Sequence, residues 1–316
     1  MKLKIVFLVI TSFNLFSQGS EFNLEDFKAE KSFPEFRGSV PSSVDLAKYL
    51  PFSFPQSGGT CVAMSFCTAR TMLHAIQNNV SNQKQITRNM LSPYFLYYLA
   101  RKKSDYDCEA GLNPVNVSRI IKKNGFQRIF EVEYPKYYPF SNNTLCPNKI
   151  DFYPPSLSSD LASASDFAVK EVYVTKELSG IKYALSLNMP VVLCMQVSKS
   201  FELLNKPQWI PALNENKNRS LGGHAVVIIG YNDSVNGGSF KIFNSWGESW
   251  GAKGMAWISY RDIVKWMDGA FIMEPYKNSK NYSFKPEVVK PETIDLIRYQ
   301  KTHKFNNSEL VDIFNN

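Results

Sequence analysis

The distribution of apolar positions divides the chain into a helical first half and a strand-rich second half. Between Cys61 and about Asn78, apolar residues recur at spacings of three and four, which predicts a helix with a broad buried face. Turn residues at 57–60 precede it and supply a start. Two further apolar stretches, 91–100 and 115–123, also predict helices.

The pattern changes after a Pro- and Ser-rich passage at residues 153–165. Strand-like runs then alternate with turns, at 191–195, 224–229, 240–243 and 255–260. No internal repeat is evident. The chain is therefore predicted to have an α+β fold, with helices first and antiparallel strands after them.

Composition narrows the class of protein. The chain has 316 residues, of which 44% are hydrophobic and 20% charged, which is typical of a globular protein and not of a disordered one. The formal net charge of +8 brings nucleic acid or an anionic surface into consideration. However, lysine and arginine are scattered without interleaved aromatics, so we predict a solvated surface and no nucleic-acid partner.

The first residues have the layout of a cleaved secretory signal. A basic start at 1–4 is followed by a short apolar run at 5–16 and then by small polar residues. The alternative is a membrane anchor, but so short a run does not comfortably span a bilayer. We predict a signal peptide at residues 1–17, a short leader at 18–40, a secreted or periplasmic location and no stable membrane insertion after cleavage.

Cys61 stands where the turn becomes a helix, and a helix N-terminus favours thiolate over thiol. A small buried hydrophobe is an equally good interpretation from position alone. A thiolate nucleophile also needs an imidazole within reach. His74 lies on the same helix near its opposite side and His303 lies in a polar tail, which leaves His224, although a histidine there can also be a core residue.

A predicted hairpin supports the choice of His224. If residues 232–238 close the turn, residues whose numbers sum to about 470 pair across the two strands. His224 then lies opposite a position within about two residues of Asn244. An amide there can accept the imidazole N–H and orient the ring, and Asn244 can also serve as a turn residue that ends the strand.

At this point the chain resembles the papain-like cysteine peptidases, in a divergent, bacterial-like form. The matching segments, in family order from about Pro41 to Pro275, are GTCVAMSF at 59–66, DCEAGLNP at 107–114, PVVLCMQVSKSFELL at 190–204, GGHAVVIIGY at 222–231 and FKIFNSWGESWGAKGMAWI at 240–258. The resemblance implies a two-lobed fold. A mainly helical lobe would span 41–160 and a mainly antiparallel β lobe 161–275, with the cleft between them and a polar extension at 276–316.

The resemblance also assigns roles. Asn244 would orient His224, with Trp246 covering their hydrogen bond and Gly223 supporting the base. Substrate would meet the loop of Ala110, Gly111 and Leu112. The backbone N–H of Cys61 and the amide of Gln56 would form the oxyanion hole.

Some positions depart from the family pattern. Gln56 stands five residues before the nucleophile instead of six, and Ala110 replaces the first glycine of the cleft loop. Cys108 and Cys146 match family disulfide cysteines without their usual partners, so a Cys108–Cys146 bridge is a hypothesis. Cys67 and Cys194 are interpreted as buried thiols.

The predicted function is peptide-bond hydrolysis, of the endopeptidase type, through a thioester on Cys61. No cofactor and no metal are predicted, because the cysteines and histidines are not grouped at ligand spacing. The partners are a polypeptide substrate and a proteinaceous inhibitor. Since the leader is too short for the family's helical prodomain, the enzyme would be restrained by this leader or by a separate inhibitor. The alternatives are a peptide ligase or transamidase on the same scaffold, and a binding protein that has lost activity.

Overall fold

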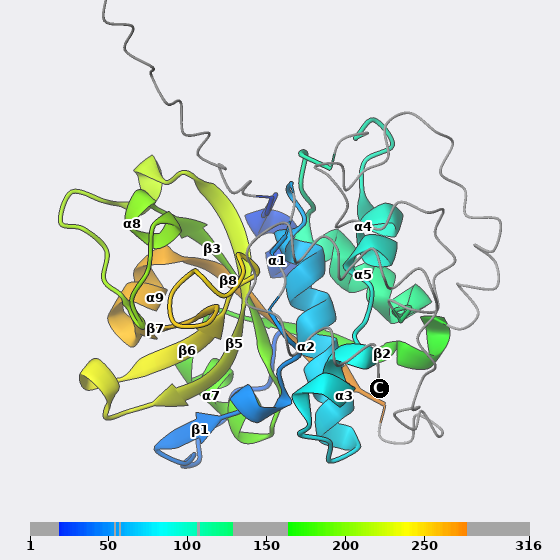
Figure 1. The fold of residues 1–316 in the computed structure, drawn as a ribbon, viewed down its shortest axis with the longest axis horizontal. Coiled ribbons are helices and arrows are strands. Elements are labelled where there is room, and N and C mark those ends of the chain that lie inside the picture. Colours follow the sequence, from blue (N-terminus) through cyan, green and yellow to red (C-terminus); the bar gives the residue numbers. More distant parts are fainter. Residues whose placement is uncertain (1–18, 54, 57, 106–107, 129–163, 277–316) are drawn as a thin grey trace, which may run out of the picture.

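The computed structural model describes residues 19–53, 55–56, 58–105, 108–128 and 164–276. The predicted signal peptide, Cys146, His303 and almost all of the predicted C-terminal extension lie outside these ranges. Figure 1 shows helices gathered on one side of the molecule and a curved sheet on the other. This α+β arrangement is the predicted fold class.

The helical side is built around α2 (Cys61–Gln77), in which 15 of 17 residues are buried. A helix that is apolar nearly all round has to be covered on all sides, and α2 lies between the other helices and the sheet. The side chains of Asn82, Ser92 and Asn113 cap the next three helices by accepting backbone N–H groups. These helices are α3 (Gln83–Arg88), α4 (Pro93–Ala100) and α5 (Pro114–Asn124).

The sheet side contains eight strands in the order β2-β8-β3-β5-β6-β7-β4, with β1 pairing with β5 off this path. All pairs are antiparallel except β4 with β7. The strands are β1 (Ser43–Asp45), β2 (Val169–Thr175), β3 (Val191–Val197), β4 (Gln208–Trp209), β5 (Gly222–Asn232), β6 (Ser239–Phe243), β7 (Met255–Ser259) and β8 (Met267–Pro275). Because β1 joins this sheet, part of the expected helical lobe pairs with the β side.

The predicted hairpin is confirmed. Val227 pairs with Phe243 and Ile228 with Ile242, so paired numbers sum to 470. The sequence analysis did not single out β2 and β8, which pair with each other about 100 residues apart along the chain. The remaining helices are α7 (Leu178–Ser186), α8 (Lys199–Glu202), α9 (Tyr260–Trp266) and the 3-10 turns Ala47–Tyr49, Ser165–Phe167, Lys217–Arg219 and Val235–Gly237.

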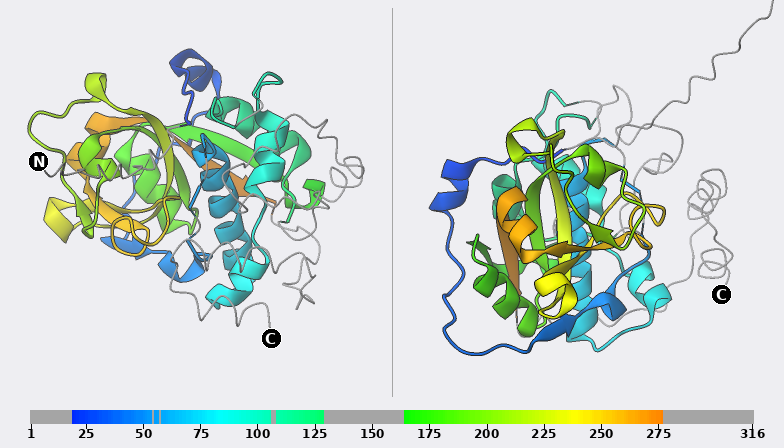
Figure 2. Two further views of the ribbon diagram at one scale, coloured as in Figure 1. Left: turned by 45° about the horizontal axis from the view of Figure 1, so that its top comes forward. Right: turned by 90° about the vertical axis from the view of Figure 1, so that its left-hand side faces the viewer.

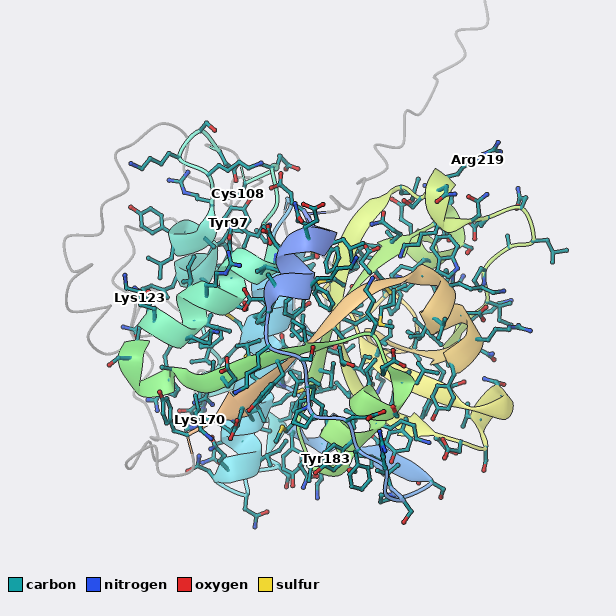
Figure 3. The ribbon with its side chains drawn as sticks, turned by 180° about the vertical axis from the view of Figure 1, so that it is seen from behind. Tyr97, Cys108, Lys123, Lys170, Tyr183 and Arg219 are labelled. Atoms are coloured by element: carbon teal, nitrogen blue, oxygen red, sulfur yellow. The ribbon has the colours of Figure 1, made fainter. Side chains whose placement is uncertain are left out.

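The leader crosses both sides of the molecule. It begins between the two lobes, forms α1 (Leu24–Ala29), and descends along the sheet to β1, as the right-hand view of Figure 2 and the rear view of Figure 3 show. No helix among the described residues is long and apolar enough to cross a membrane.

Candidate active site

Cys61 begins α2, and its side chain has no solvent exposure. Its thiol has backbone hydrogen bonds from Ala225 on β5, from Val62 and from its own N–H. Ala225 follows His224 in the chain. The packing of α2 against β5 therefore brings the thiol next to the strand that carries the predicted base.

His224 and Asn244 form a direct side-chain hydrogen bond across the β5–β6 hairpin. The distance from His224 Nε2 to Asn244 Oδ1 is 2.8 Å, and both residues are fully buried. An amide oxygen can only accept, so Nε2 donates and Nδ1 is left as the basic nitrogen of a neutral ring. That Nδ1 is buried without a hydrogen-bond partner in the described structure.

Aromatic side chains enclose the imidazole. The Trp246 ring lies 4.4 Å from the His224 ring, tilted by 30°, and Phe201 contacts both in edge-on fashion. Trp246 is 1% exposed. This packing keeps water away from the His224–Asn244 hydrogen bond, as the family resemblance implies for Trp246.

Gln56 lies beside the hairpin, but its amide is engaged in the loop. Its Oε1 accepts the Ser245 hydroxyl at 2.7 Å, and its Nε2 donates to the carbonyl of Gly58 at 2.9 Å. One of its two amide protons is thus directed to the loop. The contact with Ser245, which the sequence analysis did not anticipate, ties Gln56 to the residue after Asn244.

The leader occupies the space in front of the thiol. The N–H of Leu112 donates a hydrogen bond to the Gly19 carbonyl at 2.8 Å, and the N–H of Glu21 donates one to the Leu112 carbonyl at 2.9 Å. Ser20 donates its N–H to the carbonyl of Gly223 at 3.0 Å. Gly19 also has a backbone hydrogen bond with the Cys61 thiol. An extended backbone therefore bridges Leu112, which was predicted to meet the substrate, and Gly223, which was predicted to support the base.

Three glycines allow this close approach. A Cβ on Gly19 would lie 2.0 Å from the carbonyl oxygen of Gly59, and one on Gly111 would lie 2.3 Å from the carbonyl oxygen of Gly19. Likewise, a Cβ on Gly223 would lie 2.3 Å from the carbonyl oxygen of Ser20. No side chain fits at these positions while the leader is in place, so backbone packs directly on backbone.

Burial sets the protonation states of the covered pair. It raises the pKa of Cys61 to about 11, although backbone hydrogen bonds act in the opposite direction. It lowers the pKa of His224 to about 4, against the effect of the Asn244 hydrogen bond. In this covered state burial favours the neutral thiol and the neutral imidazole, and so opposes the effect expected from the helix N-terminus.

The remaining predicted residues are distributed around this centre. Gly111 and Leu112 are buried against the leader, whereas Ala110 is exposed. Cys108 is disulfide-bonded, but Cys146 lies outside the described residues, so the Cys108–Cys146 pairing stays a prediction. Figure 3 labels Cys108 and Tyr97 on the helical side.

Two thiols away from the catalytic position are free. Cys67 on α2 and Cys194 on β3 are fully buried, as expected for small hydrophobes. In the part of the chain that the structure describes, no group of three or more His, Cys, Asp or Glu side chains is placed to hold a metal ion.

These features define a two-lobed protein with a cysteine at a helix start and a histidine–asparagine pair on a facing hairpin. The sequence profile of the papain family cysteine proteases matches residues 40–267, and the chain belongs to this family. An uncharacterized peptidase C1-like protein of Acanthamoeba polyphaga mimivirus is 24% identical over 237 residues, which cover 73% of each chain. Cathepsin K of Mus musculus is 25% identical over 72% of this chain and 62% of its own length.

Solved structures show the same fold. Xylellain, a cysteine protease from Xylella fastidiosa, superposes with a TM-score of 0.64 at 21% identity, covering 83% of this chain and 97% of its own. A procathepsin B of Trypanosoma congolense gives a TM-score of 0.62 at 17% identity, covering 82% of this chain and 87% of its own. The papain-like fold expected from the sequence is thereby confirmed.

Proposed function

We propose that this chain is a cysteine peptidase that hydrolyses peptide bonds through a thioester on Cys61. The observation that carries the proposal is the His224–Asn244 hydrogen bond, which leaves the basic Nδ1 of a fixed ring on the strand that contacts the Cys61 thiol. A nucleophile, a base and an orienting group are the three parts that acyl transfer by cysteine requires.

The chemistry follows from these positions. His224 Nδ1 takes the thiol proton, and the Cys61 sulfur attacks the carbonyl carbon of the scissile peptide bond. The resulting oxyanion accepts hydrogen bonds from the backbone N–H of Cys61 and from the side-chain amide of Gln56. When the C–N bond breaks, His224 gives its proton to the leaving amine. Water, deprotonated by His224, then cleaves the thioester and restores the thiol.

A polypeptide substrate suits the walls of the cleft. Leu112 offers both its N–H and its carbonyl, and Gly223 offers its carbonyl, to an extended backbone. Gly111 leaves room for that backbone. These are groups that recognise main chain and not a particular side chain, so they support a peptide as the substrate.

The proposal places the enzyme outside the cytoplasm. The basic, apolar and small-residue order of the first 20 residues supports export by a cleaved signal peptide. A separate proteinaceous inhibitor remains part of the proposal.

The test is irreversible labelling of Cys61 by an epoxysuccinyl peptide, located by mass spectrometry, beside cleavage of a denatured protein substrate. Since the leader covers the thiol, a Gly19→Ala chain is labelled in parallel, and Gly19→Ala with His224→Ala serves as control. We expect stoichiometric labelling of the Gly19→Ala chain that disappears in the control. An accessible Cys61 that stays unlabelled and cleaves nothing would overturn the proposal and favour the binding-protein alternative.

The geometry of Gln56 is the one feature that favours that alternative, since part of its amide is committed to the loop. The ligase alternative is separated by product analysis: with an added amine, a transamidase yields an amide product where a hydrolase yields the free acid.

A further inference from the structure

The wall of the cleft that carries Gly111 and Leu112 is a stretch of irregular chain. It lies between α4, which ends at Ala100, and α5, which begins at Pro114. Leu112 directs its N–H and its carbonyl to the leader that lies in the cleft. Backbone groups bind an extended peptide well only if their directions are fixed beforehand, because the cost of ordering them is otherwise subtracted from the affinity. Some element beside the wall must therefore hold it in place.

Tyr97 on α4 supports the wall from the helical side, where Figure 3 labels it. Its side chain is 2% exposed, and its hydroxyl accepts a hydrogen bond from the backbone N–H of Gly111. Burial and the hydrogen bond to the Asp105 carboxylate raise the pKa of this hydroxyl, so it keeps its proton. A buried, protonated tyrosine is thus the direct support of the Gly111 peptide group.

Asp105 fixes the direction of that hydroxyl. The Tyr97 O–H donates to Asp105 Oδ2 at 2.6 Å, and Asp105 is 4% exposed. A hydrogen bond to a carboxylate is about twice as strong as one between neutral groups. With its proton given to Asp105, the hydroxyl can only accept from other partners, and this donation strengthens it as an acceptor. The Gly111 N–H therefore meets a hydroxyl that is oriented to accept it.

The turn after α4 holds Asp105 in place. The N–H of Asp105 donates to the carbonyl of Lys102 at 3.0 Å, and its own carbonyl accepts a hydrogen bond from the Arg101 guanidinium. The Arg101 guanidinium in turn lies over the Tyr98 ring, 5.3 Å from its centre. The carboxylate is thus anchored by residues that directly follow the helix and by the helix itself.

The other side of the wall is tied to the turn before the nucleophile. The N–H of Gly59, two residues before Cys61, donates to the carbonyl of Cys108 at 2.7 Å. A Cβ on Gly59 would lie 2.8 Å from the Gly111 nitrogen, so the two segments pack backbone against backbone. The wall is therefore held between this turn and the Tyr97 hydroxyl.

We propose that Tyr97 and Asp105 are positioning residues for substrate binding, which hold the Gly111–Leu112 wall in the conformation that pairs with an extended peptide main chain. This inference rests on the proposed peptidase function. Both side chains act through the backbone of Gly111, and the chemical step is left to Cys61 and its partners. Loss of the hydroxyl should therefore weaken substrate binding without slowing bond cleavage.

The first test measures the Gly111 amide in the intact chain. Tyr97→Phe keeps the ring that fills the site and removes only the hydroxyl. Amide hydrogen exchange at Gly111, followed by NMR, should become at least about tenfold faster, since this N–H loses its acceptor. Tyr98→Phe is the matched control on the same helix, because a phenylalanine ring keeps the contact with Arg101. It should leave the exchange unchanged. Equal exchange in Tyr97→Phe and the parent chain would overturn the proposal.

The second test measures peptide hydrolysis in the Gly19→Ala chain, in which the new Cβ, 2.0 Å from the Gly59 carbonyl oxygen, should displace the leader. Adding Tyr97→Phe should raise KM about tenfold and leave kcat nearly unchanged, as expected when ground-state binding is lost. Alkylation of Cys61 by iodoacetamide, which is too small to bind along the wall, should keep its rate. A purely structural role would lower the melting temperature and leave KM as it is, which would overturn the proposal.

Two variants of Asp105 separate orientation of the hydroxyl from its removal. Asp105→Asn keeps an oxygen that can accept the Tyr97 hydroxyl, so KM should rise by less than about threefold. Asp105→Ala removes the acceptor and should approach Tyr97→Phe. An unchanged KM in Asp105→Ala would overturn the role of Asp105. If Gly111 exchange rises in Tyr97→Phe while no chain hydrolyses peptide, the support of the wall stands and the proposed peptidase function fails.

Discussion

The imidazole half of the candidate site and its thiol half are held by different kinds of structure. His224 and Asn244 lie 20 residues apart on one hairpin, joined by a 2.8 Å hydrogen bond and enclosed by Trp246 and Phe201. Cys61 is instead covered by Gly19, a residue of the leader that lies 42 positions earlier. The base is thus prepared by local structure, whereas the state of the nucleophile depends on a segment that is distant from it in sequence.

The largest effect expected is on the nucleophile. Cys61→Ala should lower peptide hydrolysis by about 10⁴-fold or more, because the thioester cannot form. Cys67→Ala is the matched control, since Cys67 is equally buried on the same helix. Both variants should fold, as judged by circular dichroism. Equal activity of the two would show that Cys61 is no more than a core residue.

The second effect tests the enclosure of the base. Trp246→Ala should lower the free energy of unfolding by about 3–5 kcal/mol, the usual cost of removing a buried aromatic side chain. It should also admit water to His224 and raise the pKa of that ring from its buried value of about 4.

Denaturant unfolding and the pH profile of Cys61 alkylation in the Gly19→Ala background measure these two effects. Trp250→Ala is the control, because Trp250 is also buried but contacts Phe201 and not the imidazole. It should destabilise the protein and leave the pH profile unchanged. A shift of the profile in both variants would contradict a specific role for Trp246.

The third effect concerns Gln56, which contacts Ser245 beside the imidazole half and is proposed to act with the Cys61 N–H of the thiol half. Gln56→Ala should reduce kcat by about 10²-fold with little change in KM, because an oxyanion donor acts in the transition state. Ser245→Ala removes only the hydroxyl that donates a hydrogen bond to the Gln56 side chain, so it should reduce kcat by less. An unchanged kcat in Gln56→Ala would mean that the Cys61 N–H acts without a second side-chain donor.

The smallest effect expected is on the pH dependence of the free energy of unfolding, to which His224 and Cys61 contribute at opposite ends of the pH range. Because the folded pKa of His224 lies near 4, below its ordinary value of 6.5, stability is lost as pH falls from 6.5 toward 4. At pH 5 the free energy of unfolding should be about 2 kcal/mol lower than at pH well above 6.5. The folded pKa of Cys61 is raised from 9.0 to about 11, so its contribution is lost as pH rises through that range.

Urea unfolding at pH 5, 7 and 10 measures this dependence, with His224→Asn and Cys61→Ala as references. His224→Asn should remove part of the acid-side loss only, and Cys61→Ala part of the alkaline-side loss only. His74, whose pKa burial lowers to about 3, should supply an acid-side loss that persists in both references. Identical pH curves in all three chains would contradict the assignment of these two groups.

The imidazole half could be predicted from the sequence because its information is local. Gly222 and Gly223 start one strand, a polar turn closes the hairpin, and the register then follows from counting. The helix that begins at Cys61 could be predicted equally well, since its apolar face and the turn before it are adjacent in the chain. The papain-like motifs supplied the way in which these pieces are assembled.

The covered state of the thiol half could not be predicted in the same way. Gly19 meets Leu112 and Ser20 meets Gly223 through backbone groups, which every residue carries, across about 90 and 200 positions of sequence. Only the glycines hinted at a close approach, and glycines at such positions also serve turns. The effect of burial on the Cys61 pKa could therefore not be derived from the sequence, because the leader that covers the thiol is distant from it along the chain.

The glycine-lined contact between leader and cleft has a consequence for ligand measurements. Any inhibitor of the intact chain competes with a segment that cannot diffuse away and acts at an effective concentration of order millimolar. Its apparent dissociation constant is raised by the reciprocal of the fraction of molecules with an open cleft. A screen on the intact chain would thus rank compounds by their ability to displace Gly19 and Ser20. The same screen on the Gly19→Ala chain would rank them by their affinity for the open cleft.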